Sequence, residues 1–245
     1  MENLDSLITD FSVSDAKRVK THLTKLLPYI DINKMVIVGG LAIRYLLTKA
    51  GIKYPIRPFN DLDLMVKEAS DVSPKVSNDF LIYHYHPPRN NSFYIVLVDP
   101  VSKTKVDIFD WDPPLEEFIT VDFKGYQLKM RSTEDQLVKT VYDIQRISEE
   151  KKVDPKQFED TKLLMQIVDL KKANKIWRKR NFKDYPNSLQ KAVERANKIA
   201  KQHPEWLQRD PFKIAEPYQC VACKSTKKFK ITPMKEIYKI LRYVA

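Results

Sequence analysis

Residues 35–38, Met-Val-Ile-Val, form a short apolar run that ends directly at two adjacent glycines, Gly39 and Gly40. Apolar residues then recur at helical spacing over 41–50, so the pattern predicts a buried strand, a tight turn and a helix in succession. The chain has only four glycines, and a pair at this turn lets the backbone approach a bound group closely. Because the start of a helix offers unpaired amides, the pattern favours an anion such as phosphate here.

Asp61 directly precedes the next strand pattern, 62–66, and Asp63 lies within it. Side chains two positions apart leave a strand from the same face, so both carboxylates are predicted to project together while Leu62 and Leu64 enter the core. Neighbouring carboxylates repel each other, and a hard divalent cation converts that repulsion into binding. The alternative is an exposed strand face with ordinary surface carboxylates.

A third carboxylate, Asp107, lies inside the strand pattern 105–111 with an apolar residue on each side. Those neighbours favour it over Asp110, which is the second choice. Three such carboxylates can hold two Mg²⁺ ions roughly 4 Å apart, the geometry used in phosphoryl transfer. The predicted metal ligands are Asp61, Asp63 and Asp107.

The chain changes character near residue 130. Before it, strand patterns dominate, and Lys124-Gly125 is predicted to join a hairpin. Beyond it, helical patterns begin at Ser132. We therefore predict an α+β fold, with a small mixed sheet and flanking helices in a catalytic domain at 1–130, followed by a mostly helical, basic domain at 131–245 that binds nucleotide and acceptor.

Helical spacing extends over several further stretches of the chain. The first predicted helix has Ser14 as its N-cap. The predicted helices cover 14–27, 132–147, 155–173, about 187–201 and about 233–243.

The formal net charge of +11 is concentrated in the second half of the chain. Residues 1–128 hold 15 Lys or Arg against 17 Asp or Glu, whereas the remaining 117 residues hold 28 against 15. This split predicts that one part of the chain is catalytic and that the other binds a polyanion. The alternative is that lysine-rich helices only keep the protein in solution.

Aromatic residues are interleaved with basic ones at 175–186. They are predicted to stack on bases while the basic side chains meet phosphates. In the alternative, the aromatic residues, Phe182 and Tyr185 among them, pack inward on a solvated helix. The predicted nucleic-acid-binding residues are Lys175, Trp177, Arg178, Lys179 and Arg180.

A strand, a glycine pair, a helix, Asp-x-Asp and a later third Asp together resemble the nucleotidyltransferase superfamily with the polymerase-beta-like fold. Within it, the chain is most similar to the abortive-infection type of bacterial toxin, through Gly39-Gly40-Leu41-Ala42 and the run from Arg57 to Asp61-Leu62-Asp63. The resemblance covers roughly 35–165. It implies a nucleoside triphosphate as substrate and Mg²⁺ as cofactor, with two ions.

The resemblance also implies that Lys139 binds the triphosphate and that Asp160 positions or activates the acceptor. The alternatives are that Lys139 is a surface lysine and that Asp160 pairs with Lys156 on the same helix face. Arg44 and Arg57 are predicted to reach a phosphate, as is the glycine pair.

Other candidate ligands are weaker. Cys220 and Cys223 form a Cys-x-x-Cys, but a structural zinc needs four ligands and no second pair exists. His84 and His86 alternate onto one strand face, as a metal pair or as two edge-strand histidines.

The sequence predicts a cytoplasmic protein with reduced thiols. It has two cysteines, no basic region ahead of an apolar leader, and no apolar run long enough to span a membrane.

We predict a Mg²⁺-dependent nucleotidyltransferase that moves a nucleoside monophosphate to an acceptor hydroxyl, favouring RNA, and tRNA in particular, because of the charge split. The protein is then a possible toxin with an antitoxin partner. One alternative is a nucleotidyltransferase acting on an antibiotic or other small molecule. Another is a non-catalytic protein on the same fold that binds nucleic acid or a protein partner.

Overall fold

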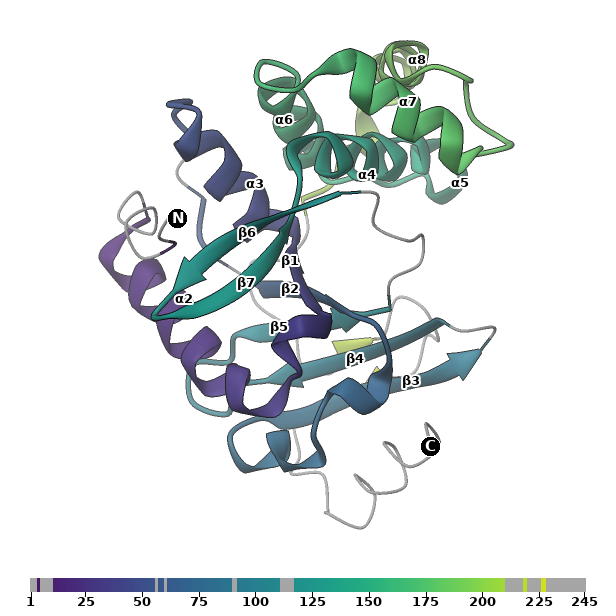
Figure 1. The fold of residues 1–245 in the computed structure, drawn as a ribbon. Helices are drawn as coiled ribbons and strands as arrows, with labels where there is room; N and C mark the ends of the chain where they lie inside the picture. The colour runs from purple at the N-terminus through teal and green to yellow at the C-terminus, as the bar shows by residue number, and fades with distance from the viewer. Residues whose placement is uncertain are drawn as a thin grey trace.

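The computed structural model describes residues 4, 11–55, 57–59, 61–89, 92–110, 117–209, 218–219 and 226–227. The first part of the chain forms a seven-stranded mixed sheet, and a group of helices that follows in sequence lies at one end of it (Figure 1). The sheet order is β3-β4-β5-β2-β1-β7-β6. Its strands are β1 (Met35–Val38), β2 (Asp61–Val66), β3 (Leu81–Arg89), β4 (Ser92–Val98), β5 (Lys105–Phe109), β6 (Phe118–Phe123) and β7 (Tyr126–Arg131).

Two helices, α2 (Val13–Leu26) and α3 (Gly39–Lys49), bury apolar residues against the sheet. Leu62 and Leu64 of β2 lie in this core, as the alternation predicted. The N-cap of α2 is Ser12, whose side chain accepts a hydrogen bond from the amide of Asp15. The prediction of Ser14 is therefore wrong by two residues.

The middle of the sheet fixes which side chains become neighbours. Strand β1 runs antiparallel to β2, with Val38 opposite Asp63. Strand β2 runs parallel to β5, with Asp63 opposite Asp107 and Asp61 opposite Lys105. Since residues two apart share a strand face, these four polar side chains leave the sheet on one side.

The second part of the chain is helical, as predicted from the change near residue 130. The helix expected over 155–173 is two helices, because the chain turns after residue 164 and Asp169 caps the second one by accepting bonds from the amides of Lys171 and Lys172. The helices are α4 (Thr133–Gln145), α5 (Ile147–Glu150), α6 (Pro155–Leu164), α7 (Leu170–Arg180) and α8 (Leu189–Gln202).

Short elements complete the described chain. The 3₁₀ turns are η2 (Leu27–Tyr29), η3 (Ile32–Lys34), η4 (Ala69–Asp71), η5 (Pro74–Asn78) and η6 (Pro204–Trp206). A small separate ladder pairs β8 (Tyr218–Gln219) with β9 (Thr226–Lys227). The predicted helix at 233–243 and both cysteines, Cys220 and Cys223, lie outside the described residues.

The helical part packs on α3 through a second apolar core. Ile43 and Leu47 of α3 meet Leu137 and Val141 of α4, and Trp177 of α7 joins them. The fold class is therefore α+β as predicted. The division into domains at residue 130 stays a prediction.

None of the helices in the described ranges combines the length and the apolar character that crossing a bilayer requires.

Candidate active site

Three carboxylates meet where β2 and β5 pair. Asp61, Asp63 and Asp107 each offer an oxygen, and these oxygens all lie within 4.8 Å of one another. The parallel register produces this cluster, because it sets Asp63 directly opposite Asp107. Carboxylate oxygens are the ligands that Mg²⁺ prefers in proteins, so the three residues are suited to hold it.

A lysine that the sequence analysis did not single out belongs to the same cluster. Lys105 lies two residues before Asp107 on β5, and its Nζ is 2.5 Å from Asp107 Oδ2 and 3.5 Å from Asp61 Oδ2. Tyr94 of β4 donates a hydrogen bond of 2.8 Å to the other oxygen, Asp107 Oδ1. The period of two along 105–107 was the available signal for Lys105.

Burial and mutual repulsion set the electrostatics of the cluster. Burial raises the pKa of Asp63 well above its usual value, and the charges of Asp61 and Asp107 raise it further. Burial also raises the pKa of Asp107, although the Lys105 ammonium opposes that shift. Burial lowers the pKa of Lys105, but the charges of Asp107, Asp61 and Asp63 and the hydrogen bond to Asp107 together raise it above its usual value. Without a metal, the site therefore disfavours the ionised forms of Asp63 and Asp107.

Gly39 allows the strand-to-helix turn to lie against the cluster. Its φ is +65°, and a Cβ there would collide with the Asp63 carboxylate. Gly40 has open space where its Cβ would be. The first glycine is therefore required by the local geometry, and the second leaves the start of α3 uncovered.

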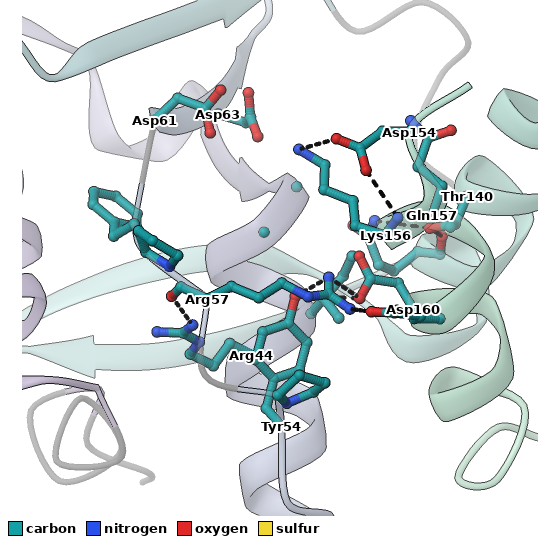
Figure 2. Close-up of a pocket in the computed structure, with 18 of the residues that line it drawn as sticks. Arg44, Tyr54, Arg57, Asp61, Asp63, Thr140, Asp154, Lys156, Gln157 and Asp160 are labelled. Carbon is teal, nitrogen blue, oxygen red and sulfur yellow. Dashed lines mark hydrogen bonds and ion pairs between the residues drawn. The ribbon is translucent and has the colours of Figure 1, made fainter. Parts of the chain in front are cut away.

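A cavity of about 680 Å³ lies between the carboxylates and the helical part. Gly39, Gly40, Asp61 and Asp63 line one side, and residues of α4 and α6 line the other. Figure 2 shows Lys156 reaching from α6 toward the side of Asp61 and Asp63. The lining also includes Arg44, Tyr54, Arg57, Gln136, Thr140, Asp160 and Arg209.

Arg44 and Arg57 line the cavity, but contacts within the protein engage both guanidinium groups. Arg44 donates a 2.7 Å hydrogen bond to the carbonyl oxygen of Arg57 and lies 3.9 Å from the centre of the Phe11 ring. Arg57 donates at 2.7 Å to Asp160 and at 3.0 Å to the Tyr54 hydroxyl (Figure 2). These bonds hold the loop that precedes β2 against α6.

Asp160 lies in the cavity wall with 4% of its surface exposed. Burial raises the pKa of this carboxyl, while the Arg57 guanidinium opposes that shift. Its contact with Arg57 gives Asp160 a role in joining the loop to α6. The acceptor-activating role implied by the resemblance stays a prediction.

Lys139 does not line the cavity; its Nζ lies 2.5 and 2.6 Å from the two carboxylate oxygens of Asp143. Lys156 lines the cavity, and its Nζ is 3.9 Å from Asp154 Oδ2. Burial raises the pKa of Asp63, and the positive charge of Lys156 opposes that shift. The structure thus directs a lysine from α6, which the sequence analysis did not assign, toward the carboxylates.

The predicted nucleic-acid-binding residues of α7 divide into two groups. Trp177 is 2% exposed and its Nε1 donates to the carbonyl oxygen of Pro186, and Arg180 is ion-paired at 2.7 Å with the buried Asp135. The structure corrects the prediction for these two residues, because neither side chain is available at the surface. The residues that remain exposed are Lys175, Arg178 and Lys179.

Two further predicted aromatics pack inward as well. Phe182 stacks on Tyr142 of α4 at 4.6 Å between ring centres, and Tyr185 meets the same ring at 5.7 Å. The stacking platform expected at 175–186 is therefore part of the second apolar core.

The second-choice ligands lie outside the three-carboxylate group. Asp110 is buried just beyond the end of β5, and His84 is buried on β3. The side chain of His86 lies outside the described residues.

No family model matches the chain, and neither does any curated protein. One similar solved structure is an antigenic nucleotidyltransferase-like protein from Paracoccidioides brasiliensis, at 16% identity and a TM-score of 0.44, covering 82% of this chain and 96% of that one. Another is the antibiotic-resistance factor ANT(2'')-Ia, at 16% identity and a TM-score of 0.43, covering 78% and 98%. At these scores, neither structure assigns an activity to this chain.

Replacement of Gly39 by Ala should lower the free energy of unfolding by about 1–3 kcal/mol, because the residue keeps a positive φ and its Cβ displaces the Asp63 carboxylate. Gly40→Ala is the matched control; it should be neutral or stabilise the helix by up to about 1 kcal/mol. Urea unfolding monitored by circular dichroism measures both. Equal effects at the two positions would contradict the close approach of Gly39 to Asp63.

Asp63→Asn should stabilise the metal-free protein at pH 7. Folding raises the pKa of Asp63 from its usual value of 3.8. The protonated carboxyl therefore contributes fully to the free energy of unfolding below pH 3.8, and this contribution is lost as the pH rises through the pKa of the folded state. The gain from the amide should therefore shrink as the pH falls toward 4. Urea unfolding in EDTA from pH 4 to pH 8 measures it, with the exposed Asp184→Asn as control. A variant less stable than wild type at pH 7 would disprove the repulsion.

Proposed function

We propose that the protein is a Mg²⁺-dependent nucleotidyltransferase. The observation that supports this most strongly is the set of three carboxylates within 4.8 Å, next to a glycine turn that begins a helix and beside a cavity of about 680 Å³. A cavity of this size is within the range of small-ligand sites. Asp61, Asp63 and Asp107 fit a hard divalent ion, and Gly39 leaves room for the Asp63 carboxylate.

In the proposed reaction, an acceptor hydroxyl attacks the α-phosphorus of a nucleoside triphosphate in line with the leaving group. The new oxygen–phosphorus bond forms while the bond to pyrophosphate breaks, and the hydroxyl proton is released. Bound Mg²⁺ would supply charge neutralisation at the phosphate oxygens. The chain's own contribution is positioning, through the amides at the start of α3 and the cations that face the cavity.

Lys156 is the cation that we propose for the triphosphate. It faces the carboxylates from α6, and its nearest carboxylate in the structure is 3.9 Å away, at Asp154. Arg44 and Arg57 are engaged within the protein, as is Lys139 with Asp143. An ammonium that forms only a loose contact is better placed to bind a phosphate.

RNA is the acceptor that we propose, with tRNA as the first candidate. The support is the exposed basic row on α7, Lys175, Arg178 and Lys179, in the half of the chain with excess positive charge. Phosphate contacts of this kind are independent of base sequence. A toxin role with an antitoxin partner, and a cytoplasmic location, remain predictions that belong to this proposal.

The proposal predicts that the purified protein, with Mg²⁺ and labelled nucleoside triphosphates, transfers label to total tRNA. A combined Asp61→Asn and Asp63→Asn variant should lose at least about 1000-fold of the rate, since the metal ligands are removed. Replacing Lys175, Arg178 and Lys179 by Gln should weaken RNA binding and make it less sensitive to salt. Full transfer by the Asp variant would contradict the mechanism.

Two other outcomes separate the alternatives. Label on small hydroxyl compounds but not on RNA would move the acceptor to the antibiotic class. Absence of binding between Mg²⁺-nucleotide and the protein would show a non-catalytic member of the fold.

Lys156→Ala should weaken binding of a non-hydrolysable triphosphate analogue by about tenfold or more, because one charge-assisted hydrogen bond is lost. Lys162→Ala is the matched control, since Lys162 lies exposed on the same helix and does not line the cavity. Titration calorimetry with Mg²⁺ present measures both. Equal affinity in the Lys156 variant and the wild type would remove Lys156 from the nucleotide site.

A further inference from the structure

Lys105 occupies a particular position within the carboxylate cluster. It lies directly opposite Asp61 on the neighbouring strand and shares a strand face with Asp107. Its Nζ is 2.5 Å from Asp107 Oδ2 and 3.5 Å from Asp61 Oδ2, so one ammonium spans both strands. Only 23% of the Lys105 side chain is exposed, so most of it lies against neighbouring residues.

Both oxygens of Asp107 have a partner from the protein. Lys105 is ion-paired with Oδ2, and the Tyr94 hydroxyl donates to Oδ1 at 2.8 Å. The Asp107 side chain is only 5% exposed, which leaves little space for it to turn toward another ligand. Asp61 and Asp63 are more accessible from the cavity, and both line it.

The charge balance of the cluster also favours a single divalent cation. Metal binding requires all three carboxyls to be deprotonated, and three carboxylates with one ammonium leave two negative charges, which a single divalent cation neutralises. An ion on Asp107 Oδ2 would lie at most about 4.6 Å from the Lys105 Nζ, because Mg²⁺–oxygen distances are about 2.1 Å. Two cations at that distance in a partly buried site repel each other strongly.

We propose that Lys105 is a built-in counter-charge that positions Asp107 and limits the three carboxylates to one divalent ion before nucleotide binds. The inference rests on the proposed function and refines it. It replaces the expected pair of protein-held ions by one ion, held mainly by Asp61 and Asp63, and one ammonium. A second ion would then arrive only with the triphosphate.

Direct Mn²⁺ binding to the full chain without nucleotide tests this proposal. Equilibrium dialysis or electron paramagnetic resonance should find one Mn²⁺ per wild-type chain. Lys105→Met should bind a second Mn²⁺ or hold the first at least tenfold more tightly, because the competing charge is gone. Lys67→Met is the matched control, since Lys67 is exposed just after β2; it should behave as wild type.

The outcomes distinguish this inference from the proposed function. Two Mn²⁺ ions in the wild type, or unchanged number and affinity in Lys105→Met, would overturn the role of Lys105 and leave the metal site intact. No Mn²⁺ binding in either protein, or binding that persists in the Asp61→Asn and Asp63→Asn variant, would overturn the metal site itself.

Loss of the partly buried ammonium can impair folding of Lys105→Met. Thermal unfolding in EDTA and in Mn²⁺ covers that case: Mn²⁺ should raise the melting temperature of the variant more than that of the wild type. An equal shift would count against the proposal, and the ion count of the wild type is independent of the variant.

Discussion

The parallel pairing of β2 with β5 is the interaction on which the site depends. It places Asp63 opposite Asp107 and Asp61 opposite Lys105, so four charged side chains share one face at the centre of the sheet. A shift of one residue would send one strand's pair into the apolar core. The sheet's hydrogen bonds and its buried face hold the three carboxylates close together. A divalent metal ion would offset the repulsion between them.

The helical part completes the cavity from the other side. Its packing against α3 fixes α6 so that Lys156 faces the carboxylates. The contacts of Arg57 with Asp160 and Tyr54 join the loop before β2 to the same helix (Figure 2). The loop, α3 and α6 are therefore held together before any ligand arrives, which lowers the entropic cost of binding.

Local patterns sufficed for much of this structure. The apolar period of two identified β2 and β5, and with them the three carboxylates, because strand alternation depends only on neighbours in sequence. Contacts set by tertiary packing were not predictable in the same way. Strand pairing places the ammonium group of Lys105 beside the carboxylates, and helix docking directs that of Lys156 toward them. The burial of Trp177 depends on the core between α4 and α7.

We propose that this cluster binds a metal-nucleotide complex for nucleotidyl transfer. A crystal structure with Mn²⁺ and a non-hydrolysable triphosphate analogue, with anomalous scattering at the manganese edge, tests it most directly. We expect an anomalous peak at an ion bound by Asp61 and Asp63, with the triphosphate between the start of α3 and Lys156. Manganese bound elsewhere, or a nucleotide outside this cavity, would contradict it.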